Sequence, residues 1–118
     1  MGTNNSNPFG GILGNSVIIK VTQQFIGDHD EPYSLSYMHE LTETSKPAIK
    51  DAFKTLLKTG LIYRANKNYK RPLYKINKGS KKYVALSLLS YAALDDINKT
   101  NTMDEALKEY IDSEMENA

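Results

Sequence analysis

The sequence predicts a small, mostly α-helical domain that carries one β-hairpin, an α+β fold. Apolar residues recur at helical spacing in several segments, most clearly between positions 45 and 60. Two short segments rich in aromatic and branched apolar residues, 61–67 and 70–77, instead fit a pair of neighbouring strands. With 118 residues and an ordinary apolar fraction, the chain can form one hydrophobic core. We therefore expect a single domain.

The N-terminal part is expected to hold a tail and two helices. Residues 1–11 are mainly Asn, Gly and Ser, which is typical of a flexible tail. Asn15 or Ser16 can cap a first helix, and the polar segment 27–32 ends it. A second, short helix is predicted over 36–41, followed by a tight connection.

The third helix has the clearest signals at both ends. Ser45 or Lys46 can cap it, and Pro47 falls in the first turn, where a missing backbone N–H costs little. Gly60 is a typical helix stop. The buried face predicted from helical spacing consists of Ile49, Ala52, Phe53, Leu56 and Leu57.

The C-terminal half begins with the hairpin and continues in helices. The two strands enclose a basic tip, and Pro72 suggests an edge or bulged position. A fourth helix, 81–98, is apolar on more than one face. Thr102 and Glu105 match a capping box that opens a last, acidic helix.

This order of elements is that of a winged helix-turn-helix. Residues 56–64, L-L-K-T-G-L-I-Y-R, resemble the L-x-x-x-G-L-I-x-R passage from recognition helix into wing of MarR-, ArsR- and PadR-type transcriptional regulators. Residues 74–80 resemble their Y-x-L-T-x-x-G exit from the wing, with Asn77 in place of Thr and Gly79 one place early. The resemblance covers residues 15–97 and identifies no single subfamily. The metal-binding Cys/His set of arsenic-sensing members is missing from the sequence.

The resemblance implies a domain organisation and a function. Residues 12–98 would form the winged-helix domain with its C-terminal dimerisation helix, after the tail 1–11, and 99–118 an acidic C-terminal helix or tail. We expect sequence-specific binding of double-stranded DNA by a homodimeric regulator, a repressor, located in the cytoplasm with the nucleoid. The chain has no cysteine, signal peptide or apolar run that spans a bilayer, so no membrane partner is expected.

The net charge of +1 conceals a strong segregation of charge. Residues 46–82 carry twelve Lys and Arg against Asp51 alone, a net charge of +11. The segments before and after it carry −4 and −6. A local positive field of this kind favours a polyanionic partner.

The resemblance places the recognition helix, about 45–59, in the major groove and the wing, about 62–76, on the backbone or minor groove. Lysines four apart on the helix share one face, and Asp51 can accept from a cytosine amino group. The start of the second helix can hold a phosphate, or be merely capped. The simpler readings of the basic groups are a solvated helix face and an ordinary polar hairpin. The candidate DNA-binding residues are Ser34, Ser36, Tyr37, Ser45, Lys46, Lys50, Asp51, Lys54, Arg64, Lys67, Asn68, Tyr69, Lys70 and Arg71.

The second apolar face of segment 81–98 predicts a twofold dimer, unless the first and last helices cover it within one chain. The candidate dimerisation residues are Val84, Leu88, Tyr91 and Ala92. His29 and His39 have no Ser or Cys partner at a recognisable spacing, and no glycine-rich phosphate loop occurs. We therefore expect no enzyme, no cofactor and no metal site.

Two other functions use the same sequence features. An architectural or partition protein would coat DNA with little sequence preference through the same basic surface. A winged helix can also serve as a protein–protein interaction module. A footprint separates the first from a regulator, and binding to duplex DNA at moderate salt separates the second. RNA binding is less favoured, because no run of stacking aromatic residues lies on a strand.

Overall fold

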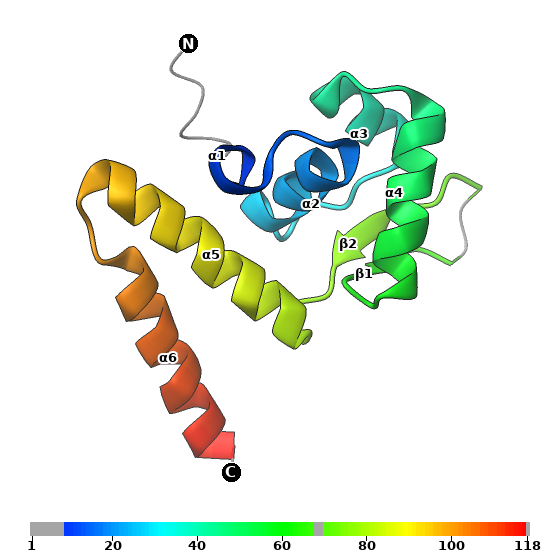
Figure 1. Cartoon of the computed structure of the whole chain (residues 1–118). Coiled ribbons are helices and arrows are strands. Elements are labelled where there is room, and N and C mark those ends of the chain that lie inside the picture. Colours follow the sequence, from blue (N-terminus) through cyan, green and yellow to red (C-terminus); the bar gives the residue numbers. More distant parts are fainter. Residues whose placement is uncertain (1–8, 68–69, 118) are drawn as a thin grey trace.

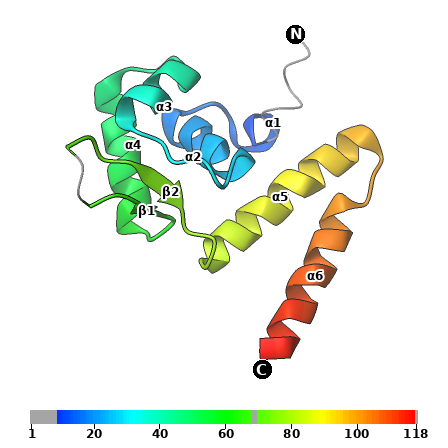
Figure 2. The same cartoon turned by 180° about the vertical axis from the view of Figure 1, so that it is seen from behind.

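The computed structural model describes residues 9–67 and 70–117, and it is mainly helical with one antiparallel hairpin, as predicted. Figure 1 shows a body formed by the elements up to the hairpin, and an arm in which two long helices form a V beside it. Figure 2 shows the same division from behind. The elements are α1 (Gly10–Leu13), α2 (Val17–Gly27), α3 (Leu35–Thr42), α4 (Lys46–Lys58), β1 (Ile62–Arg64), β2 (Tyr74–Ile76), α5 (Lys81–Asn98) and α6 (Thr102–Asn117).

Serine side chains cap four of the helices. Each Oγ accepts a hydrogen bond from a backbone N–H two or three residues further on, over 3.0 to 3.4 Å. A cap of this kind typically contributes about 1 kcal/mol. Ser45 and Pro47 begin α4 as predicted, and Gly60, at a φ of 79°, follows its end. The capping residues are Ser16 for α2, Ser34 for α3, Ser45 for α4 and Ser80 for α5.

An aromatic cluster joins the elements of the body. The Phe25 ring of α2 lies 5.2 Å from Tyr33 and 5.3 Å from Phe53 of α4. Phe53 in turn lies 5.2 Å from Tyr74 of β2, and Tyr37 of α3 stacks on Tyr33 at 5.3 Å. Two of these pairs are edge-to-face and one is stacked, and such ring pairs add to the stabilisation from burial alone. The cluster therefore fixes α3, α4 and the hairpin relative to one another.

The N-terminal tail predicted over 1–11 differs from the structure at its end. Phe9 is fully buried in the core, and its backbone N–H donates to Gln23 Oε1 at 2.8 Å. Residues 10–13 then form the short helix α1, which packs on α2. A single Phe among Gly and Asn carries no periodic signal, so the sequence pattern could not reveal this anchor.

The paired part of the hairpin is shorter than predicted. The register joins Ile62 to Ile76 and ends at the pair Arg64 and Tyr74. Beyond that pair the Ala65 N–H still donates to the Leu73 carbonyl at 2.7 Å. The Asn66 amide then bridges the hairpin, because its Nδ2 donates to the Arg71 carbonyl and its Oδ1 accepts from the Leu73 N–H. A side chain therefore closes the hairpin where strand pairing was expected.

The arm is held together by a carboxylate at its bend. Asp95 of α5 accepts from the backbone N–H groups of Thr102 and Met103 at 2.9 and 2.8 Å, and from the Thr100 hydroxyl. The capping acceptor for α6 is thus Asp95 of the preceding helix, where the sequence suggested a capping box at Thr102. These bonds, that of the Thr100 hydroxyl first, lower the pKa of Asp95.

Candidate nucleic-acid interface

Helix α4 presents a basic face opposite the face that it buries. Ile49 and Phe53 are in the core, whereas Lys46, Lys50 and Lys54 are exposed. Among the residues that the structure describes, no carboxylate lies within ion-pairing distance of these three lysines. Their charge is therefore not compensated locally, and they can bind an anion.

The same helix carries two polar groups beside the lysines. Asp51 is exposed, and the Thr55 hydroxyl donates to the Asp51 backbone carbonyl at 3.2 Å, which leaves the Asp51 carboxylate to the surface. Asp51 also borders a shallow depression of about 310 Å³ between α4 and the start of α2. Ser45 is exposed as well, although its hydroxyl accepts from the Ala48 N–H as a cap.

The hairpin carries the second group of cations. Arg64, Lys67, Lys70 and Arg71 are all exposed, and the Arg64 Nε donates to the Asn66 carbonyl at 2.7 Å. The predicted contacts Asn68 and Tyr69 lie outside the described residues. Figure 1 shows the hairpin extending to one side of α4, so both basic elements belong to one end of the body.

The three residues predicted as DNA contacts at the start of α3 differ in their exposure. Ser34 is only 8% exposed, and its hydroxyl accepts from the Tyr37 N–H at 3.0 Å, so it serves as a helix cap beneath the surface. Ser36 and Tyr37 remain exposed. The stack on Tyr33 holds the Tyr37 ring in one position.

Sequence reasoning left out two residues of this surface, Lys58 and Asn66. Lys58 is exposed and continues the row of lysines every four residues, so spacing alone could have identified it. Asn66 positions the tip through bonds across the hairpin, which no local pattern indicates. Lys78 is directed elsewhere, because its Nζ lies 2.5 Å from Asp30. That hydrogen bond lowers the pKa of Asp30 and raises the pKa of Lys78.

The predicted dimerisation residues Val84, Leu88, Tyr91 and Ala92 are all half-buried. The first three line a groove that α6 forms with α5 in the same chain, so α6 covers part of this face. Large apolar side chains remain exposed on α1, α5 and α6. They are Ile12, Leu13, Ile97, Leu107, Ile111 and Met115, between 37% and 72% exposed.

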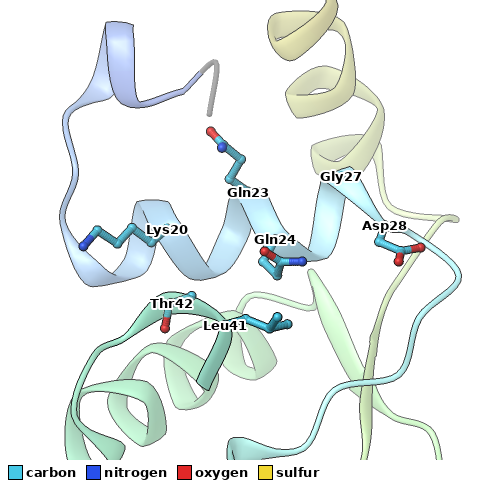
Figure 3. Close-up of a pocket in the computed structure, with 7 residues that line it drawn as sticks. All are labelled: Lys20, Gln23, Gln24, Gly27, Asp28, Leu41 and Thr42. Carbon is cyan, nitrogen blue, oxygen red and sulfur yellow. The ribbon is translucent and has the colours of Figure 1, made fainter. Parts of the chain in front are cut away.

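We also searched the described residues for a metal site, a membrane-spanning helix and a ligand pocket. Within the described residues, no group of three His, Cys, Asp or Glu is placed to hold a metal, and no helix is long and apolar enough to cross a membrane. Figure 3 shows a depression of about 410 Å³ between α2 and α3. There, Gln24 donates to the Tyr33 hydroxyl and Thr42 donates to the Met38 carbonyl. The charged ends of Lys20 and Asp28 point away from each other.

Solved structures of two transcription regulators share this architecture over nearly the whole chain. MepR of Staphylococcus aureus, a transcription regulator of the multidrug efflux pump MepA, matches with a TM-score of 0.57 at 10% identity, over 97% of this chain and 87% of MepR. The transcriptional regulator BldR of Sulfolobus solfataricus matches with a TM-score of 0.54 at 15% identity, over 98% of this chain and 84% of BldR. The fold is a winged helix of the MarR type. No protein-family model and no curated protein matches the sequence.

The winged-helix fold predicted from the sequence is therefore confirmed. In this fold α3 and α4 form the helix-turn-helix pair, and β1 with β2 form the wing. The segments expected as recognition helix and wing, 45–59 and 62–76, coincide with α4 and the hairpin. The lysine face and the basic wing tip thus lie on the two elements with which winged helices commonly contact DNA.

Proposed function

We propose that this chain is a transcription regulator that binds double-stranded DNA as a homodimer and acts as a repressor. The observation that carries the proposal is the exposed lysine face of α4 beside the basic wing. Twelve cationic side chains fall between residues 46 and 82. In the described part of the chain, Lys78 pairs with Asp30, whereas Lys46, Lys50 and Lys54 of α4 have no carboxylate within ion-pairing distance. A surface of this charge, on this fold, fits the DNA backbone.

In the proposed complex α4 enters the major groove. Lys46, Lys50 and Asp51 lie in its first two turns, the part of a recognition helix that commonly contacts base edges. Lysine can donate to guanine acceptors and aspartate can accept from a cytosine amino group. The wing cations Lys67, Lys70 and Arg71 would contact phosphates and fix the register.

The two matched proteins support the regulatory part of the proposal. MepR is a transcription regulator of the multidrug efflux pump MepA, and BldR is a transcriptional regulator. We carry over the general role alone, and not their targets. A regulator of this kind would be found in the cytoplasm, on the nucleoid.

The proposed dimer uses the arm. Large apolar side chains are exposed on α1, α5 and α6, and exposed apolar patches commonly mark protein–protein interfaces. A second copy related by a twofold axis would cover them, together with the part of Val84, Leu88, Tyr91 and Ala92 that α6 leaves open. Such a dimer presents two recognition helices to two half-sites.

A selection from random duplex DNA, followed by a footprint on the enriched sequences, tests the proposal. A discrete palindromic footprint is expected. Failure to bind duplex DNA at moderate salt would overturn it and leave the protein-interaction reading.

One observation favours the architectural alternative. All the cations of α4 are lysines, which bind phosphate as point charges and lack the bidentate geometry of arginine. Continuous coverage of DNA without an enriched sequence would support that alternative.

A further inference from the structure

The end of α4 and the start of α5 carry lysines to which the DNA contacts above give no role. Lys58 closes the row of exposed lysines on α4, and Lys81 and Lys82 open the first turn of α5. Figures 1 and 2 both show the start of α5 close to the C-terminal end of α4. We call these three lysines the junction patch.

Asn77 joins the two segments that carry the junction patch. Its Nδ2 donates to the Gly60 carbonyl at 3.1 Å, and its Oδ1 accepts from the Gly79 N–H at 3.1 Å. Its backbone N–H donates to the Leu61 carbonyl at 2.8 Å, and its carbonyl accepts from the Ser80 N–H at 3.0 Å. The end of α4 and the start of α5 are therefore bonded to the same residue, which fixes the patch relative to α4.

The charge of the junction patch is not compensated locally. All three lysines are exposed, and no carboxylate of the described residues lies within ion-pairing distance of them. The first turn of α5 also has no acidic residue, although the N-terminus of a helix favours acidic side chains and disfavours cations. Two lysines at this position do not help the helix to form, which favours a role in binding.

An acidic loop, residues 28–31, lies against another side of α5. The His29 ring of this loop is 6.3 Å from the Tyr83 ring, and Lys78 binds one of the three carboxylates of the loop. Lys81 comes two residues before Tyr83, and such residues are turned about 160° from each other around a helix. The charge of Lys81 is therefore directed away from the loop.

The length of α4 indicates what the junction patch meets in a DNA complex. Lys46 and Lys58 are about 18 Å apart along the helix axis, whereas the major groove is about 12 Å wide. With its first two turns in the groove, as proposed above, α4 extends past the groove edge at Lys58. The polyanion at that edge is the sugar–phosphate backbone.

We propose that the junction patch binds the DNA backbone beside the groove that α4 enters, as a third contact surface apart from the first turns of α4 and the wing tip. This inference rests on the proposed DNA binding, and it adds that the bound duplex extends past the base pairs that α4 contacts. Lysine suits such a contact, because it binds phosphate as a point charge on a flexible side chain.

The double variant Lys81→Gln, Lys82→Gln tests the patch on the intact chain, by titration with a duplex that carries the selected site at several salt concentrations. The slope of log affinity against log salt should fall by about two for each bound chain, and affinity at about 0.1 M salt should fall at least about tenfold. The matched control, Lys99→Gln with Lys108→Gln, removes the same charge from exposed positions of the arm and should change neither quantity. Equal effects of the two double variants, or an unchanged slope, would overturn the proposal.

Ethylation interference then identifies the phosphates that the patch contacts. For the unchanged chain, we expect essential phosphates beyond the bases that α4 protects, and the variant Lys81→Gln, Lys82→Gln should lose these while keeping those of the wing. Loss of the same phosphates in Lys70→Ala would overturn the proposal, because the patch would then be part of the wing contact.

Two further measurements separate the possible failures. Urea unfolding should show the variant Lys81→Gln, Lys82→Gln to be at least as stable as the unchanged chain, because two cations have left a helix N-terminus. Weaker DNA binding that accompanies a loss of stability would overturn the proposal. If the unchanged chain itself does not bind duplex DNA, the proposed function fails and this inference fails with it, whereas binding without a contribution from the patch leaves the proposed function intact.

Discussion

The body and the arm of this chain are stabilised in different ways. In the body, α2, α3, α4 and the hairpin all contribute rings to one aromatic cluster, and the core residues around it are almost completely buried. In the arm, Ser90 is the buried residue of α5, and none of the described side chains of α6 is buried. Helix α6 packs mainly on α5. The body has the interactions of a self-sufficient unit, whereas the arm leaves much apolar surface for something else to cover.

The largest expected effect comes from the centre of the body. Phe53 is 2% exposed and contacts both Phe25 and Tyr74. Phe53→Ala should lower the free energy of unfolding by about 3–5 kcal/mol, because it leaves a cavity where three elements meet. Urea unfolding measures the change.

Leu107→Ala on α6 is the control for the arm and should cost less than about 1 kcal/mol in the monomer, since Leu107 is 37% exposed. Similar losses from both changes would contradict the division into body and arm.

The next effect separates the two basic elements of the body. Lys50→Ala should cost about 1–3 kcal/mol on the selected DNA site and less on random DNA, because a base contact is lost. Lys70→Ala should weaken both DNAs together and reduce the slope of log affinity against log salt by about one. Both side chains are exposed, so neither variant should unfold. Titrations of each variant against selected and scrambled duplexes measure the difference. If Lys50→Ala lowered both affinities equally, α4 would be a phosphate clamp and the architectural reading would be preferred.

A third change tests what covers the arm. Ile111 is 46% exposed on α6, so Ile111→Glu should leave the monomer folded but place a charge in the proposed interface. We expect sedimentation to show a monomer at tens of micromolar, a concentration at which the unchanged chain should form the proposed dimer. Affinity for a palindromic site should fall on the order of tenfold, because the two half-sites are then bound separately. Lys108→Gln on the same helix should have neither effect. An Ile111→Glu variant that remains a dimer would contradict the placement of α6 in the interface.

The two regions also differ in how far the sequence predicted them. The limits of α4 and its basic face follow from signals within fifteen residues, namely Ser45, Pro47, the apolar spacing and Gly60. The core position of Phe9 and the closing of the hairpin by Asn66 depend on contacts with residues 7 to 14 positions away, which no local pattern encodes. Of the candidate site, the exposure of the lysines was predictable. The burial of Ser34 was not, because it depends on how α3 packs.

The bend of the arm likewise depends on contacts between residues that are distant in the sequence. The sequence pattern placed a capping box at Thr102, since a Thr followed by Glu at the third position after it is a common helix start. In the structure the acceptor comes from Asp95, seven positions earlier and on another helix. A carboxylate can accept from two backbone N–H groups at once, and here it does so across a turn whose Lys99 has a φ of 58°. One ionised side chain therefore helps to set the angle between α5 and α6, beside the packing of α6 on α5.

The smallest expected effect follows from that dependence. The Thr100 hydroxyl and the N–H groups of Met103 and Thr102 all favour the ionised form of Asp95, so its pKa in the folded chain lies below the usual 3.8. A group with a lowered pKa stabilises the folded state above its unfolded pKa, and that contribution is lost as the pH falls through the folded pKa. The bend should thus stay intact at neutral pH and loosen below pH 3.8.

The amide resonances of Thr102 and Met103, followed by nuclear magnetic resonance, should titrate with a midpoint below that value. Asp30→Asn, which removes the other carboxylate of lowered pKa, should leave this midpoint unchanged, whereas Asp95→Asn should abolish the transition. A midpoint at or above 3.8 would mean that Asp95 does not hold the bend, and the angle of the arm would then have to come from packing of α6 on α5 alone.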